Sequence, residues 1–499
     1  MGEKELFERF SWLPKAVIDF IRDLIAKLKA KDAELQSKDA EIETLRAENQ
    51  KLKERLSLDS HNSSMPPSSN RPGSKPTPKS LRTPSGKKPG GQRGHKGHGI
   101  KHLQTREPDK IVEHWPDVCD GCGNREQCAE LGRSANSQYE YDVLFVPVIT
   151  KHEIVECVCP LRGGEKLVGS APLHSTHEYG KGLQALCVLL YTFGTVSYDR
   201  IKELIQGLFG FSISVGTIYK AVQSCQKGLE STIDWIKTQL ANSLLLFVDE
   251  TGFNVNGKNH WIHGMSDGEL KYMSVQEKRG YEGMILAGVL EFFKGIGMHD
   301  CWSSYSKFKD MVHALCNAHL LRELIERWEN TGQEWTQRMI VLLLRIKSSK
   351  EDIMAAGGDT FPADQWTAFK NEYDSIVAEG LELNPPPPRD PNKKGRPAKG
   401  KTLCLLERLR DRDSALLRFA TDFSVPFDNN EAERLMRHSK NRQKISGCMR
   451  TVTGAQAYCD IMSYLLSTRS HEINTFDAIL HVFNGTSLPL VQSLRPELG

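Results

Sequence analysis

The spacing of apolar residues near the N-terminus predicts a long helix that pairs with another helix. Side chains seven positions apart form one seam, consisting of Ile21, Leu28, Leu35, Ile42 and Leu56. The neighbouring seam contains Leu24, Leu45 and Leu52. Asn49 interrupts the first seam, where a buried amide favours one register, and Lys31 and Lys38 weaken the second. We expect a homotypic coiled coil over residues 1–58, with an intramolecular helical hairpin or a lone solvated helix as alternatives.

From Leu244 onward the pattern changes to period two and to continuous apolar runs, which are typical of strands. LLLFVDE predicts a buried strand, and Asn256 and Gly257 predict a hairpin turn into KNHWIHGMS and then LKYMSVQ. A helix in YEGMILAGVLEFF, a fourth strand in GIGMHD, and a further helix and strand ending in HALCNAH follow. Three hairpin-linked strands followed by alternating helix and strand are the order of an RNase H-like sheet.

Three carboxylates lie where this strand order would bring them together. Asp249 is on the first strand and Asp300 ends the fourth, and these strands are adjacent and parallel in such a sheet. Glu433 follows in FDNNEAERLMRHSK, where Asp428 or Asn429 can cap a helix. Converging carboxylates suit two Mg²⁺ or Mn²⁺ ions for phosphoryl transfer, because these hard cations prefer oxygen ligands.

Cations accompany Glu433 along the predicted helix. Arg434, Arg437 and Lys440 recur every three or four residues and are candidate phosphate contacts, with Lys440 two turns beyond Glu433. Arg434 and Arg437 could instead pair with acids structurally. Between residues 324 and 425 the chain is helical and charged and is broken by LNPPPPRDPNKKGRPAKGK. We therefore expect a catalytic domain in two parts, 241–323 and 426–499, with a helical insertion between them.

Composition and charge add a basic arm and exclude a membrane protein. The chain has 499 residues, enough for several domains, and lacks a run of about 18 apolar residues or a signal peptide. We expect a cytoplasmic, nucleoid-associated protein. Residues 71–101 carry nine Lys or Arg, two His and no acid among many Pro, Gly and Ser. This predicts a flexible basic arm over residues 59–105, with a plain solvated linker as the alternative.

DNA contacts are expected from this arm and from a helical segment over residues 176–240. In the arm the candidates are Lys87, Lys88, Arg93 and Lys96. In the helical segment two apolar runs flank FGFSIS, and the second begins at Ser214 as a cap. Its exposed candidates are Thr217, Tyr219 and Lys220. A helix-turn-helix fits this pattern, and so does any compact helical hairpin.

A cysteine cluster over residues 106–175 predicts structural zinc. The candidate ligands are Cys119, Cys122, Cys157 and Cys159, separated by a stretch over 139–157 whose β-branched residues suggest a hairpin. Cys128, His152 or His114 could replace one ligand, because the second pair has the weaker C-x-C spacing. The alternative is a set of unconnected reduced thiols.

Taken in order, these segments resemble a DDE transposase of the insertion sequence 66 family nearly end to end. The resemblance rests on the coiled coil, the NSSMPPSSN and KKPGGQRGHKGH segments, the cysteine cluster, the helical stretch and the interrupted sheet. The most specific single motif is DNNEAER. The resemblance implies a multidomain α+β protein with an N-terminal coiled coil, a zinc-binding β module, a helical DNA-binding domain and an RNase H-like α/β catalytic domain with an α-helical insertion.

The resemblance also assigns roles to particular residues. It implies that Asp249, Asp300 and Glu433 are the catalytic triad, with Glu433 preferred over Glu431 because the family glutamate directly precedes the arginine of the motif. Cys316 and His319 in CNAHLLREL look like a C-x-x-H pair found in several DDE families, and either packing or metal binding fits them. The C-x-C spacing at 157–159 departs from the stronger zinc pattern.

The expected function is Mg²⁺-dependent cleavage and transfer of double-stranded DNA at the ends of a mobile element and at its target. The expected partners are DNA, a second copy of the chain through the coiled coil, and accessory proteins of the same element. Two alternatives are an RNase H-fold nuclease or resolvase without transposition, and a catalytically silent DNA-binding regulator. The terminal repeats, the target preference and the transposition pathway lie beyond the sequence.

Overall fold

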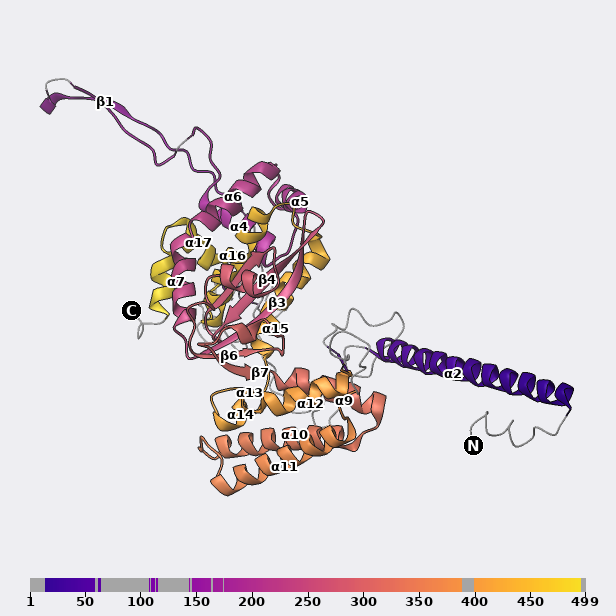
Figure 1. Cartoon of the computed structure of the whole chain (residues 1–499). Coiled ribbons are helices and arrows are strands. Elements are labelled where there is room, and N and C mark those ends of the chain that lie inside the picture. The colour runs from indigo at the N-terminus through magenta and orange to yellow at the C-terminus, as the bar shows by residue number, and fades with distance from the viewer. Residues whose placement is uncertain are drawn as a thin grey trace. The chain divides into compact units, whose positions relative to one another are not determined.

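The computed structural model describes residues 14–58, 62–63, 107, 109–112, 114, 143, 146–162, 165–173, 175–387 and 399–494. They form a mixed α+β protein with a long N-terminal helix and a central sheet (Figure 1). The chain divides into two compact units, one of residues 1–77, 173–204 and 212–499 and the other of residues 78–172 and 205–211. Among the described helices none is long and apolar enough to cross a membrane.

Several of the predicted site residues lie outside the described ranges. These are the arm candidates Lys87, Lys88, Arg93 and Lys96, and the zinc candidates Cys119, Cys122 and Cys128.

The N-terminal apolar seam lies on one continuous helix, α2 (Lys15–Ser57), of 43 residues. Residues 15–57 therefore do not fold into a helical hairpin. The seam is exposed, with Leu28 62% and Leu35 58% accessible. At its C-terminal end, Glu54 lies 3.4 Å from the Lys401 ammonium and 3.8 Å from the Arg327 guanidinium. The last turn thus contacts the helical insertion, while over most of α2 no described residue of the chain covers the apolar seam.

In the second unit a short hairpin stands where the cysteine-rich module was expected. Strands β1 (Glu156–Cys159) and β2 (Glu165–Val168) pair antiparallel around the 3-10 turn η4 (Pro160–Arg162). The prediction of a hairpin over residues 139–157 is wrong for residues 146–155, which form no strand. Their side chains find no apolar surface among the described residues, and Val148 and Ile149 are 87% and 95% exposed. Cys157 is an exposed free thiol.

Residues 176–240 are helical, as predicted, but they form four described helices where the sequence pattern indicated two apolar runs. The four helices are α4 (Lys181–Thr192), α5 (Tyr198–Phe209), α6 (Val215–Lys227) and α7 (Glu230–Ala241). Ser214 caps α6 as expected, because its hydroxyl accepts the Thr217 N–H at 3.0 Å. The buried stripe of α6 packs against α4 and α16 (Val452–Ser470).

The central sheet has the predicted strand order and directions. Its order is β5-β4-β3-β6-β7, with bounds β3 (Leu245–Val255), β4 (Lys258–Ser266), β5 (Lys271–Gln276), β6 (Ile296–His299) and β7 (Val312–Leu315). The first three strands are antiparallel, whereas β6 runs parallel to both β3 and β7. Asn256 and Gly257 both have positive φ, as a tight hairpin between β3 and β4 requires.

The links between these strands are less helical than the sequence suggested. Helix α8 (Tyr281–Leu286) covers only the first half of the expected helix. Between β6 and β7 the expected helix is wrong, because that link holds only the 3-10 turn η5 (Tyr305–Lys307). There Asp300 accepts the Trp302 N–H at 2.8 Å, a side-chain bond that turns the chain directly after the strand.

The helical insertion shares a hydrophobic core with the parallel edge of the sheet (Figure 1). Its helices are α9 (Asn317–Thr331), α10 (Glu334–Ala355), α11 (Ala363–Leu383), α12 (Lys401–Asp411), α13 (Asp413–Leu416) and α14 (Arg418–Thr421). Fully buried Trp335, Tyr373 and Leu406 belong to the same cluster as Met298 of β6 and Leu315 of β7. The insertion is therefore built onto the sheet.

Four described helices follow the insertion, and one of them, α16, covers the opposite edge of the sheet. They are α15 (Asn430–Ser446), α16, α17 (Thr475–Phe483) and α18 (Ser487–Ser493). Side chains of α16 accept backbone N–H groups of the edge strand β5, namely Ser467 from Lys271 at 2.8 Å and Ser463 from Met273 at 2.8 Å. Gln456 accepts the next such N–H group along β5, that of Val275, at 3.1 Å. The edge strand is thus closed to further strand pairing.

Replacing Ser463 with Ala should destabilise the protein, because the buried Met273 N–H then has no acceptor. We expect a loss of about 1–3 kcal/mol in the free energy of unfolding, measured by urea denaturation followed by tryptophan fluorescence. Ser470→Ala, at the exposed end of α16, is the matched control and should stay within about 0.5 kcal/mol of the parent. Equal effects of the two changes would contradict the edge-capping role of Ser463.

Candidate active site

Two of the predicted acids come together through the parallel pairing of β3 and β6. Phe247 pairs with Met298 in this register, so that Asp249 and Asp300 follow two residues later on adjacent strands. Each acid has one oxygen held by a backbone N–H: Asp249 accepts that of Glu250 at 2.9 Å, and Asp300 that of Trp302 at 2.8 Å. The second oxygen of each has no hydrogen bond to the described chain.

Helix α15 brings the third acid to the sheet through a close approach at Gly264. Gly264 pairs with Asp249 across β3 and β4. A Cβ at this position would lie 2.0 Å from Met436 Cε and 3.1 Å from Leu435 Cδ2. The missing side chain therefore lets α15 lie directly on the strand beside Asp249. This contact places the first turn of α15, with Glu433, over the carboxylates.

Asn429 fixes the start of that helix. It is buried, and its Nδ2 donates to the Val248 carbonyl at 2.9 Å, while its backbone N–H donates to the Cys316 sulfur at 3.2 Å. Asn429 makes no side-chain cap, and its buried Oδ1 accepts no hydrogen bond from the described residues; at the helix start Asp428 instead accepts the Asn430 N–H at 3.2 Å. One residue thus joins β3, the start of α9 and α15.

The electrostatics of Asp249 show that the acids share one neighbourhood. Burial raises the pKa of Asp249 well above its usual value, and the negative charges of Glu250, Asp300 and Glu433 raise it further. Only the backbone N–H of Glu250 acts in the opposite direction. A buried group of four like charges favours either protonation or a bound cation.

Glu250 is a fourth acid that the sequence reasoning missed. Its carboxylate accepts two bonds from the Arg279 guanidinium, at 2.8 and 3.0 Å, and one from the Tyr305 hydroxyl at 2.6 Å. Burial and Asp300 raise its pKa, whereas Tyr305 and Arg279 lower it. Arg279 also stacks on Trp261 and Trp302, 4.9 and 4.2 Å from their ring centroids. The only signal in the sequence was the D-E pair in FVDETGF.

The neighbours of Glu433 differ sharply from those of Glu431. Ammonium and guanidinium groups of Lys271 and Arg434 lie 3.2 and 2.8 Å from Glu431. The guanidinium and imidazole nitrogens around Glu433 are farther away, at 3.8 Å for Arg437 and at 3.9 Å for Arg322 and His319. Its Oε1 is buried without a hydrogen-bond partner. Glu431 is thus held by ion pairs, while Glu433 has an oxygen available for a ligand.

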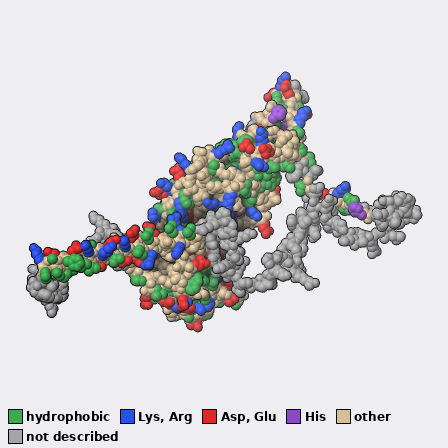
Figure 2. Space-filling view, turned by 90° about the vertical axis from the view of Figure 1, so that its right-hand side faces the viewer, with side chains coloured by type: hydrophobic (Ala, Val, Ile, Leu, Met, Phe, Trp, Pro, Cys, Tyr) green, Lys and Arg blue, Asp and Glu red, His purple; other side chains and the backbone are tan. Residues whose placement is uncertain are grey.

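The predicted DNA contacts lie on the surface in varied settings. Arg434 and Arg437 are 64% and 67% exposed. Lys440 donates to the Gly252 carbonyl at 2.8 Å, so it is engaged with β3. In α6, Thr217 shares a hydrogen bond with Ser214, and Tyr219 and Lys220 are exposed. Figure 2 shows basic and acidic side chains interspersed over one face.

Comparison with known families decides the class of this protein. The model of the Transposase IS66 family matches residues 177–457. This range includes the described elements from α4 to α15 and the acids Asp249, Asp300 and Glu433. The chain belongs to the IS66 transposase family. A second model, a family of unknown function (DUF6444), matches residues 17–101. No curated protein matches the chain.

Membership in the IS66 family makes this protein a transposase, and so a DNA-binding, DNA-processing enzyme of a family that uses divalent metal. The residues present fit such an ion. Asp249 and Asp300 each have an oxygen without a hydrogen bond, Glu433 has a buried oxygen without a partner, and mutual repulsion of the acids would be relieved by a cation. The donor set is all oxygen, as Mg²⁺ prefers.

Replacing Asn429 with Ala should loosen the junction that carries Glu433. The variant loses the buried bond to Val248, and we expect a loss of about 1–3 kcal/mol in the free energy of unfolding, measured by urea denaturation. The neighbouring Asn430 is exposed, so that Asn430→Ala is the matched control and should change stability by less than about 0.5 kcal/mol. If both variants unfold at the same urea concentration as the parent, Asn429 does not hold the junction.

Proposed function

We propose that this transposase cleaves and joins DNA strands by metal-dependent phosphoryl transfer, with Asp249, Asp300 and Glu433 as its catalytic acids. The observation that carries the proposal is the convergence of Asp249 on β3, Asp300 directly after β6 and Glu433 on α15. Burial and Glu250 raise the pKa of Asp249, and the charges of Asp300 and Glu433 raise it further. The strand order β5-β4-β3-β6-β7 supports an RNase H-like catalytic domain over residues 241–323 and 426–499.

The three acids would hold Mg²⁺ or Mn²⁺, which when bound activates an attacking hydroxyl and neutralises charge on the scissile phosphate. The chain itself orients the acids. Backbone N–H groups of Glu250 and Trp302 each fix one oxygen, which directs the other toward the ligand. Arg279 and Tyr305 hold Glu250 beside the site, where its partial neutralisation limits repulsion of Asp249.

Positive groups around Glu433 are suited to the phosphodiester. Arg437 and Arg322 lie near this acid without close bonds to it, so their guanidinium groups can donate hydrogen bonds to phosphate oxygens. Arg434 and Lys440 extend the same helix. Further DNA contacts are proposed from Thr217, Tyr219 and Lys220 of α6 and from the basic arm, and structural zinc is proposed for Cys119, Cys122, Cys157 and Cys159.

We also propose that α2 joins two copies of the protein as a parallel coiled coil. The support is its continuous 43-residue length and the exposure of its apolar seam, including Leu28, Leu35 and Leu52. An isolated helix with such a seam gains stability by burying it against a partner. Two copies would bring two catalytic sites to the two ends of one element.

Removing a catalytic acid should abolish strand cleavage and transfer without loss of DNA binding. We expect Asp249→Asn and Glu433→Gln to lose at least a thousandfold in Mg²⁺-dependent strand transfer, roughly 4 kcal/mol in the activation barrier. The measurement uses DNA from the flanks of the gene as donor and a supercoiled plasmid as target, and gel-shift titration gives DNA affinity.

The control for this experiment is Glu431→Gln, because Glu431 is paired with Lys271 and Arg434 and has no proposed catalytic role. It should retain transfer within about tenfold of the parent. Full transfer activity in Asp249→Asn, or equal losses in Glu431→Gln and Glu433→Gln, would refute the assignment of the triad.

Charges placed in the apolar seam should separate the two copies. We expect the double variant Leu28→Glu and Leu35→Glu to weaken self-association at least tenfold, measured by sedimentation equilibrium of the full chain. Ala33→Glu lies outside both seams of the same helix and is the matched control. Identical association of the parent and the double variant would show that α2 does not hold the copies together.

A further inference from the structure

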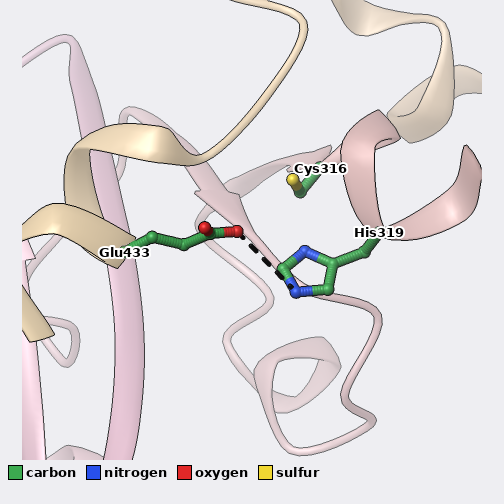
Figure 3. A group of neighbouring side chains, drawn as sticks. All are labelled: Cys316, His319 and Glu433. Carbon is green, nitrogen blue, oxygen red and sulfur yellow. Dashed lines mark ion pairs between the residues drawn. The ribbon is translucent and has the colours of Figure 1, made fainter. Parts of the chain in front are cut away.

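Cys316, His319 and Glu433 form a cluster of three potential metal ligands. One ligand atom from each lies within 4.8 Å of the other two. Figure 3 shows the Glu433 side chain, from α15, extending toward the imidazole of His319, with the Cys316 sulfur beside that ring. Two segments that the long insertion separates in sequence thus contribute to one group.

The start of α9 places two of these ligands, Cys316 and His319, on the same helical turn. Cys316 occupies the cap position of the helix and His319 lies three residues later, so both side chains lie on the first turn. The Cys316 sulfur is buried and is held by the Asn429 N–H at 3.2 Å. This spacing of one helical turn is compatible with two ligands of one ion.

The polar atoms of the cluster lack partners. His319 Nδ1 and Glu433 Oε1 are both buried without a hydrogen bond in the described chain. The distance between His319 Nε2 and Glu433 Oε1 is 3.9 Å, too long for a hydrogen bond. Buried unpaired polar atoms are costly, so two of them facing the same space indicate an absent ligand.

The donor set selects the class of ion. A thiolate, an imidazole and a carboxylate are the ligands of Zn²⁺ and similar borderline ions, whereas Mg²⁺ takes oxygen. Burial and the nearby Arg322 lower the pKa of His319, which favours the neutral imidazole that a metal ligand needs, while the negative charges of Glu433, Asp300 and Glu323 favour a bound cation. The positive charge of Arg322 opposes a bound cation, but this side chain is 30% exposed, lies 3.9 Å from Glu433 and can turn toward solvent.

We propose that Cys316, His319 and Glu433 bind one Zn²⁺-class ion, at a site that shares Glu433 with the catalytic metal site. On binding, the Cys316 thiol releases its proton to solvent and its sulfur joins the imidazole nitrogen and one Glu433 oxygen around the ion. Because Glu433 serves both sites, the ion withdraws a carboxylate from the Mg²⁺ ligands and inhibits strand transfer. This inhibition rests on the proposed function, while the binding does not.

The binding test uses Co²⁺ as a spectroscopic probe for Zn²⁺ on the full-length, metal-stripped protein. Thiolate ligation gives a sulfur-to-cobalt charge-transfer band, which reports Cys316 directly. We expect Cys316→Ser to bind one Co²⁺ equivalent fewer than the parent, and His319→Gln to weaken that equivalent at least about tenfold. Any thiolate site at Cys119, Cys122, Cys157 and Cys159 is present in all variants and cancels in the difference.

Cys404→Ser is the matched control, because it removes an exposed free thiol far from the cluster in sequence. It should bind as many Co²⁺ equivalents as the parent, and circular dichroism checks that each variant is folded. The same Co²⁺ stoichiometry, affinity and thiolate band in parent and His319→Gln would overturn the site. Should Cys316→Ser fail to fold, His319→Gln decides alone, since it leaves the capping sulfur in place.

Inhibition is tested separately by adding Zn²⁺ to strand transfer in excess Mg²⁺. We expect Zn²⁺ to inhibit strand transfer by the parent and by Cys404→Ser, and a higher Mg²⁺ concentration to overcome this inhibition. Any residual transfer by His319→Gln should need at least a tenfold higher Zn²⁺ concentration for the same inhibition as in the parent. A Co²⁺ site without strand transfer would refute the proposed function and leave the metal site standing. Transfer that is insensitive to bound Zn²⁺ would refute the shared use of Glu433.

Discussion

The buried amide of Asn429 is the contact on which the rest of the site depends. It ties the first strand of the sheet to the start of α15 by one hydrogen bond to Val248, and its backbone N–H bonds to Cys316 at the start of α9. Glu433 is one helical turn away, so its position follows from this bond. The same junction sets the distance from Glu433 to His319. Three distant segments are thereby fixed with respect to one another.

The site gathers like charges that the surrounding fold must hold in place. Three other acids lie near Asp249, and the repulsion among the four opposes folding until a cation binds. The strand beneath them is buried on both faces over most of its length, and Gly264 lets α15 lie against it. At the far edge, serine and glutamine side chains of α16 close β5. Packing on both sides therefore opposes the local repulsion.

The insertion between Asp300 and Glu433 supports the site although it separates the two acids in sequence. Its helices share one core with β6 and β7, and the Asn317 N–H bonds to the Phe427 carbonyl at 3.1 Å just before α15. The chain thus leaves and returns at the same place. Cys316 and His319, at the start of α9 just before the insertion, are further neighbours of Glu433. They connect the proposed catalytic acid with the proposed metal-ion control.

Sequence alone determined the sheet order and the long helix, because strand and helix periodicities are local. From the DNNEAER register it also predicted Glu433 as the partner of Asp249 and Asp300. It misplaced strand structure at 146–155, where Val148 and Ile149 are exposed, and the helix before β7, where the Asp300 side chain turns the chain directly after β6. Only the tertiary structure brought Glu250 to Arg279 and Glu433 to His319. Such contacts join residues far apart in the chain, so they depend on packing that no local pattern encodes.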